Sequence, residues 1–182
     1  TAVGYQSAYS NTTANFSVAI GFQSLYSGTT GGYNNAIGYG ALKATTTGDS
    51  NNALGVNALF SNTTGANNTT VGDGALRSNT TASGLTAVGT SALYANTTGT
   101  GHSAFGYVAL RYNTTGVSNT ACGQSSLYSN TTGSYNTACG VSALESNTTA
   151  SGNTAVGKSA SANSTTGTSN SCFGNQAGQN LT

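Results

Sequence analysis

Apolar and polar residues recur along the chain with one fixed period of seventeen residues. We number the positions of the repeat 1 to 17 from Thr1, call each repeat a rung, and call the residues that share a position a column. Aligned in this way the unit reads about T-A-V-G-x-x-A-L-Y-S-N-T-T-G-x-x-N. A fixed period of this kind indicates a stacked repeat architecture. Column 4 is glycine in every rung: Gly4, Gly21, Gly38, Gly55, Gly72, Gly89, Gly106, Gly123, Gly140, Gly157 and Gly174.

Four columns carry the apolar and small residues. Column 3 is apolar throughout, column 2 is Ala in nine of eleven rungs, and column 7 is only Ala or Ser. Column 8 is Leu in eight consecutive rungs, from Leu25 to Leu144. A disordered chain of this composition would have no reason to keep apolar residues in register. We therefore expect a folded array with columns 2, 3, 7 and 8 inside.

The length and turn chemistry of the unit predict β structure. Seventeen residues are too few for a helical hairpin, and Asn-Thr-Thr-Gly disfavours helix. We expect two short strands per rung, at about T-A-V-G-x and A-L-Y-S, joined by polar turns. Glycine in column 4 permits a bend or a close backbone approach, and Gly or Ala in column 14 completes a turn.

The resulting prediction is an all-β protein, a single-stranded parallel β-solenoid (β-roll) of eleven rungs about 4.8 Å apart. Residues 1–182 form one continuous array, which begins and ends inside a repeat and reads as an excerpt of a longer chain. One Val, one Leu and two Ala per rung bury little apolar surface against the cost of ordering seventeen residues. Stability must come from stacked neighbours, and the thin core favours association with further copies of the chain.

Charge and composition exclude several classes of protein. The chain has four Lys or Arg and three Asp or Glu, with a formal net charge of +1, so it has no basic footprint for nucleic acid or a membrane surface. No run of apolar residues is long enough to span a bilayer. A single His and the separated acids Asp49, Asp73 and Glu145 form no triad or carboxylate pair, so we expect no enzyme and no cofactor. We also expect no metal, because the unit lacks the Asp of calcium-binding solenoid repeats.

Charged and aromatic residues indicate the outward columns. The charges fall in columns 5, 9 and 15, and tyrosines favour columns 5 and 9. An outward file of tyrosines can bind a glycan or a surface by stacking. The alternative is that the rings pair along exposed ladders or at a subunit seam. The candidate binding residues are Tyr5, Tyr39 and Tyr107 in column 5, and Tyr9, Tyr26, Tyr94 and Tyr128 in column 9.

Asparagine, histidine and cysteine each occupy defined columns. Column 17 is Asn in seven of ten rungs, which predicts a ladder of amides bonded to the rungs above and below, with His102 as a substitute for Asn. Cys122 and Cys139 lie in column 3 and Cys172 in column 2. We expect inert buried thiols; parallel side-chain directions disfavour the alternative, a disulfide between adjacent rungs.

The Asn-Thr-Thr segments that begin in column 11 form seven glycosylation sequons, whose Asn residues are candidate glycan acceptors in a secreted eukaryotic protein. The alternative is a turn with a ladder of Thr side chains. This alternative is favoured because column 12 stays Thr where Asn is absent, as at Thr29 and Thr46. The candidate acceptors are Asn11, Asn62, Asn79, Asn96, Asn113, Asn130 and Asn147.

One stretch resembles a known repeat. Ser17-Val18-Ala19-Ile20-Gly21-Phe22-Gln23-Ser24 resembles the SVAIG-x-x-S repeat of YadA-type trimeric autotransporter adhesin heads, and Asn153-Thr154-Ala155-Val156-Gly157 looks like a variant of it. Similar NTAVGYxAL units occur in tail-fibre-like proteins of phages and bacteria. The resemblance implies a left-handed parallel β-roll with three chains side by side, displayed outside a cell or on a virion and adhering to a ligand.

The sequence thus favours a non-enzymatic, extracellular structural and adhesive fibre module, a homotrimer that also contacts a host or surface glycan or protein. No nucleic-acid partner and no membrane insertion are expected. The alternative is an ice-binding β-solenoid, since Thr files repeat at the rung spacing. Against it, adjacent Thr of columns 12 and 13 point to opposite sides, and Val18, Asn35 and Asn52 interrupt column 1. A filament of rods joined end to end through open ladder edges is a further alternative.

Overall fold

Columns 1 to 3 form one short strand in each rung, and the strands build a single sheet along the rod. A computed structural model describes residues 1–181. The strands are β1 (Ala2–Val3), β2 (Val18–Ile20), β3 (Asn35–Ile37), β4 (Asn52–Leu54), β5 (Thr69–Val71), β6 (Thr86–Val88), β7 (Ser103–Phe105), β8 (Thr120–Cys122), β9 (Thr137–Cys139), β10 (Thr154–Val156) and β11 (Ser171–Phe173).

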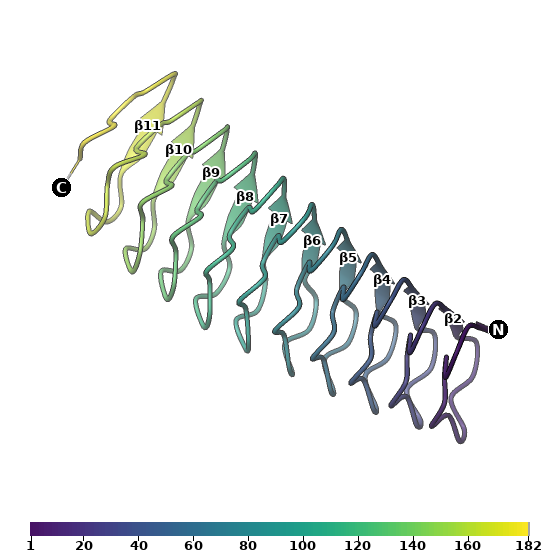
Figure 1. Ribbon diagram of the computed structural model, residues 1–182. Coiled ribbons are helices and arrows are strands. Elements are labelled where there is room, and N and C mark those ends of the chain that lie inside the picture. Colours follow the sequence, from purple (N-terminus) through teal and green to yellow (C-terminus); the bar gives the residue numbers. More distant parts are fainter. Residues whose placement is uncertain (182) are drawn as a thin grey trace.

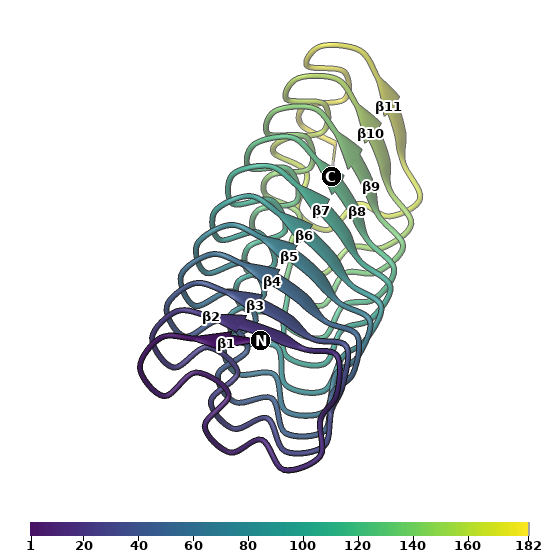
Figure 2. The same ribbon diagram turned by 90° about the vertical axis from the view of Figure 1, so that its right-hand side faces the viewer.

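Each strand pairs in parallel with the next strand along the chain. The order in the sheet is the order in the sequence, and the register places equivalent residues opposite each other, as with Ala36 and Ala53. The chain advances one coil at a time from the N-terminal to the C-terminal end of a rod (Figure 1), with the strands along one side and turns on the others (Figure 2). The predicted parallel β-solenoid is confirmed.

The second strand predicted in each rung is wrong. In none of the rungs that the structure describes does the A-L-Y-S segment form a strand; it runs as turns. Residues of columns 6 and 8 adopt left-handed φ angles, as at Asn57 (53°) and Leu59 (52°), which extended backbone does not permit. The rungs nevertheless stay bonded here, because Leu59 N–H donates to the Ala75 carbonyl at 2.9 Å.

Column 4 glycines make the close backbone approach that the sequence predicts. Their φ angles lie between 122° and 141°, a region that residues with a side chain rarely adopt. A Cβ at Gly72 would lie 2.6 Å from the carbonyl oxygen of Gly89 in the next rung. Backbone packing between rungs therefore requires glycine at this position.

The interior is built from small residues, leucines and amides. Column 8 leucines are at most 1% exposed from Leu25 to Leu144, and Ala of columns 2 and 7 packs beside them. Columns 11 and 17, which supply asparagines, are also buried along most of the rod. The interior therefore includes two columns of polar side chains in addition to the apolar columns that the sequence predicts.

Column 3 was predicted to lie inside and instead faces outward. Strand residues alternate sides, so once Ala of column 2 fills the interior, columns 1 and 3 must point away from it. Strand β3 shows this exposed–buried–exposed pattern, with Ala36 buried and Ile37 38% exposed. The prediction that Cys122 and Cys139 are buried is wrong for the same reason.

Two columns of amides bond the rungs internally. In column 17, Asn34 Oδ1 accepts the backbone N–H of Asn51 at 2.9 Å, and its Nδ2 donates to the Gly48 carbonyl at 2.8 Å. The predicted bonding from rung to rung is therefore present, mostly through the backbone. The direct side-chain ladder lies in column 11, where five amide–amide bonds join Asn62, Asn79, Asn96, Asn113, Asn130 and Asn147.

The Asn-Thr-Thr segment also forms the predicted turn and Thr ladder. Asn130 Nδ2 donates to the Gly133 carbonyl three residues ahead at 2.9 Å, which closes the turn. Thr131 Oγ1 donates to the Thr148 carbonyl of the next rung at 3.1 Å, and equivalent bonds recur along column 12. The repeated sequon is thus a structural element of the rod.

Candidate binding surface

An uninterrupted line of apolar side chains follows the outward side of the sheet. We call this line, column 3, the apolar stripe. In the interior of the rod Ile37 is 38% and Leu54 48% exposed, so the exposure is not confined to the rod ends. Its residues are Val3, Ile20, Ile37, Leu54, Val71, Val88, Phe105, Cys122, Cys139, Val156 and Phe173.

Column 5 places aromatic rings on the surface, as predicted. Tyr5 is 65% and Tyr39 52% exposed, and Phe22 between them stacks on both, with ring centroids 5.3 and 5.2 Å away. Tyr107, 56% exposed, is the other predicted tyrosine of this column. Stacked, exposed rings at the rung spacing offer flat apolar faces to a ligand.

Column 9 alternates rings and cations, and most of its side chains are half-buried. Arg77 Cζ lies 5.7 Å from the ring centroids of both Phe60 and Tyr94. Lys43 Nζ lies 5.5 Å from the Phe60 centroid, and Arg111 Cζ lies 5.5 Å from that of Tyr94. These are cation–π distances. From the N-terminal end the column reads Tyr9, Tyr26, Lys43, Phe60, Arg77, Tyr94, Arg111, Tyr128 and Glu145.

The structure brings columns 5 and 9 together across column 6. A cavity of about 220 Å³ is lined by Asn57, Asp73, Gly74, Arg77, Thr90, Ser91 and Tyr94, which come from these three columns only. Arg77 Nη1 donates to the Tyr94 hydroxyl at 2.6 Å and so joins two rungs at its edge. We call columns 5, 6 and 9 together the aromatic–cationic strip. Sequence reasoning had singled out its tyrosines but missed the alternation with Lys and Arg, although both residue types shared a column.

Tyr128 ends the run of rings in column 9. Its hydroxyl donates to the Tyr112 hydroxyl at 3.5 Å, and this hydrogen bond raises the pKa of Tyr128. The two rings meet edge to face, with centroids 5.0 Å apart.

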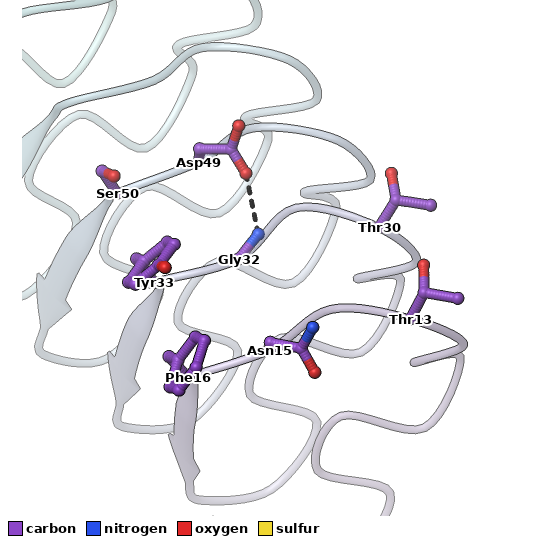
Figure 3. Close-up of a pocket in the computed structure, with 8 residues that line it drawn as sticks. All are labelled: Thr13, Asn15, Phe16, Thr30, Gly32, Tyr33, Asp49 and Ser50. Atoms are coloured by element: carbon purple, nitrogen blue, oxygen red, sulfur yellow. Dashed lines mark hydrogen bonds between the residues drawn. The ribbon is translucent and has the colours of Figure 1, made fainter.

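A second hollow of about 390 Å³ lies on columns 13, 15 and 16 of the first three rungs (Figure 3). Phe16 and Tyr33 stack there with centroids 5.2 Å apart, and Asp49 Oδ1 accepts the Gly32 N–H at 2.7 Å. Thr13, Asn15, Thr30 and Ser50 complete the lining. This group was not predicted from the sequence; its signal was a pair of aromatic residues in column 16 of successive rungs.

The candidate glycan acceptors lie mostly in the interior. Asn11 is exposed, whereas Asn62, Asn79, Asn96, Asn113, Asn130 and Asn147 are fully buried and the Nδ2 of each donates a hydrogen bond to a backbone carbonyl. A folded rod therefore presents one of the seven amides to solvent.

His102 takes the place of Asn in column 17 and makes the same two bonds. Its Nδ1 accepts the Asn119 N–H at 3.2 Å, and its Nε2 lies 2.7 Å from the Gly116 carbonyl oxygen. The first bond requires a lone pair on Nδ1, so the ring is neutral with its proton on Nε2. Burial lowers the pKa of His102 to about 4, although the bond to the Gly116 carbonyl acts in the opposite direction.

The three cysteines are unpaired thiols. Cys122 and Cys139 are register neighbours in the apolar stripe, and Cys172 is buried in column 2. Partial desolvation raises the pKa of Cys122, and the neighbouring Cys139 thiol raises it further. Across residues 1–181 no three His, Cys, Asp or Glu side chains are grouped so that they could hold a metal ion.

No protein-family model, no curated protein and no solved structure matches the chain. Within the described residues no helix has the length and apolarity needed to cross a membrane.

Proposed function

We propose that the chain is a non-enzymatic structural and adhesive module of an extracellular fibre, on a cell surface or a virion. In this proposal three left-handed rods lie side by side, as in the adhesin heads that its apolar–Gly motif resembles. The observation that carries the proposal is the apolar stripe, which runs the length of the rod on its sheet face.

The stripe is best covered by another copy of the same chain. Monomeric proteins rarely leave long apolar patches in water, and such patches usually mark interaction sites. A partner that covers column 3 along the whole rod must present apolar groups at the same spacing, about 4.8 Å. A second rod has this spacing by construction, and no residue of columns 1 to 3 is charged, so association costs no charge burial.

Sedimentation tests the association. We expect the chain to sediment as a trimer, and the double variant Ile37→Lys/Val71→Lys as a monomer, because two cations would be buried in the interface. The control is Thr64→Lys/Thr81→Lys in column 13, which is exposed and lies outside the sheet. A wild-type chain that is monomeric at high concentration would contradict the proposal, as would a trimer that survives the column 3 substitutions. Electron microscopy of the same sample distinguishes discrete trimers from rods joined end to end.

A second candidate function is ice binding, and one observation favours it. Columns 1 and 3 point outward from the same sheet, and from Thr69 to Ser171 every residue of column 1 is Thr or Ser. Hydroxyl and apolar files then lie side by side on a regular face. Column 12 contributes less, because its hydroxyls are bonded to backbone carbonyls. A thermal-hysteresis assay tests this function, and its absence at high protein concentration would exclude it.

A further inference from the structure

We infer that the aromatic–cationic strip binds a linear acidic polysaccharide, with one carboxylate for every two sugar rings, lying parallel to the rod axis. The inference rests on the proposed adhesive function of the module and names its ligand.

The cations of the strip are evenly spaced along the rod. Lys43, Arg77 and Arg111 are three of the four basic residues of the chain, and they occupy column 9 at intervals of two rungs. Two rungs of parallel β structure span about 10 Å. This is close to the length of one disaccharide in an extended chain of β-linked pyranoses. Consecutive cations therefore meet every second sugar ring.

An aromatic ring lies between each pair of consecutive cations. Phe60 separates Lys43 from Arg77, and Tyr94 separates Arg77 from Arg111. Aromatic faces stack on the apolar faces of sugar rings, and a neutral sugar needs no counter-charge. Cations and rings alternating at the rung spacing thus match a polymer in which charged and neutral sugars alternate.

The cations are in part open to a ligand. Aromatic rings pack against Arg77 and Arg111, and each side chain is half-buried, so part of it remains exposed to solvent. Arg77 is held by its bond to the Tyr94 hydroxyl, which fixes its guanidinium in place before binding. A preorganised guanidinium pairs well with a carboxylate.

The rungs between the cations add specificity against more highly charged polymers. A polymer with a carboxylate on every ring would bring every second carboxylate against Phe60 or Tyr94, which carry no positive charge, whereas a neutral sugar there needs none.

Calorimetric titration with a hyaluronan decasaccharide, in which glucuronate and N-acetylglucosamine alternate, tests the inference. We expect binding that weakens with added salt and strengthens with oligosaccharide length as further cations are engaged. Arg77→Gln/Arg111→Gln should weaken binding about tenfold or more, because two of three paired charges are lost. Thr64→Glu/Thr81→Glu is the matched control, since it lowers the net charge by the same two units at exposed positions of column 13, outside the strip; it should change affinity less than about twofold.

Two further oligosaccharides of equal length complete the test. A neutral chitin oligosaccharide and a polygalacturonate, charged on every ring, should both bind more weakly than the hyaluronan probe. Absence of hyaluronan binding would overturn the inference. So would equal affinity of the Arg77→Gln/Arg111→Gln variant, or tighter binding of polygalacturonate.

Sedimentation of the same samples separates this inference from the fibre proposal. A trimer that does not bind the probe leaves the fibre module standing and rejects the ligand. A monomer that binds the probe with the expected charge dependence rejects the association and retains the ligand.

Discussion

The glycines of column 4 show how one residue type sets the distance between rungs. Replacing Gly72 by Ala would place a Cβ against the Gly89 backbone and force a side chain into a φ of 134°. We expect Gly72→Ala to lower the free energy of unfolding by about 3–5 kcal/mol, from backbone strain and overpacking together.

Gly84→Ala is the control for this substitution. Gly84 also has a positive φ, 70°, but a Cβ there meets nothing within 4 Å. The Gly84→Ala substitution should lower the free energy of unfolding by only about 1 kcal/mol. Chemical denaturation of both variants gives the comparison, and equal losses would refute the contact with the next rung.

His102 makes the stability of the rod depend on pH. Its pKa is about 4 in the folded chain and near 6.5 when unfolded, so between these values the unfolded chain binds a proton that the folded chain excludes. The contribution of His102 to the free energy of unfolding is therefore fully present above pH 6.5. It is lost as the pH drops toward 4, by about 3 kcal/mol in total. The measurement is denaturant unfolding across this range.

His102→Asn restores the usual residue of column 17 and should remove this dependence. The carboxyl groups titrate equally in both proteins, so the difference between the two pH curves isolates the imidazole. Parallel curves would contradict the assignment of a neutral, buried ring.

At the scale of the element, the amide ladder of column 11 ends one rung early. Asn147 Oδ1 is buried without a hydrogen-bond partner, because the next residue of the column is Ser164, whose buried Oγ is also unpartnered. An Asn at this position would donate to Asn147 as Asn147 donates to Asn130, at 2.8 Å. We expect Ser164→Asn to raise the free energy of unfolding by about 1–2 kcal/mol.

Ser164→Ala tests whether the ladder is the cause of this gain. It removes the same unpartnered hydroxyl but supplies no amide to Asn147. If both variants are stabilised equally in chemical denaturation, extension of the ladder contributes nothing.

The elements also show where sequence reasoning succeeds and fails. The period, the column 4 glycines and the buried columns 2, 7 and 8 follow from the repeat alone. Column 3 was misplaced because its apolar character was taken for burial, although alternation from column 2 already placed it outside. The left-handed conformation of Leu59 and its equivalents has no sequence signal, since leucine rarely adopts a positive φ. The asparagines of column 11 were correctly predicted to form turns. Their hydrogen-bonded side-chain ladder could be recognised only in the structure, because it depends on how the amides of successive rungs face each other.

The candidate site was partly predictable for the same reason. The tyrosines of column 5 were placed outside correctly, whereas those of column 9 are half-buried except for the exposed Tyr9. That the two columns meet across column 6 depends on the turn between them, which the predicted second strand had excluded. Arg77 and Tyr94 therefore became a pair only in the structure.

At the scale of the whole molecule, the cysteines report on what covers the apolar stripe. Cys122 and Cys139 are exposed in the single rod and Cys172 is buried. If rods associate through the stripe, all three thiols should resist alkylation in the native protein. Two should react in the Ile37→Lys/Val71→Lys variant.

Mass spectrometry after alkylation gives the number of cysteines that have reacted. The alkylation is done at mildly alkaline pH because the pKa of Cys122 is raised. Unfolded protein, in which all three react, is the reference. Rapid labelling of both stripe cysteines in an oligomeric wild-type chain would place the interface elsewhere.

The backbone contact at column 4 has a consequence beyond stability. Because rung spacing is set there by glycine and carbonyl groups, it does not depend on which side chains occupy the exposed columns. Column 13, a file of exposed threonines from Thr13 to Thr166, is such a column. The rod is therefore a scaffold with a constant axial spacing. Chemical groups introduced in column 13 would be displayed in a line at intervals of about 4.8 Å.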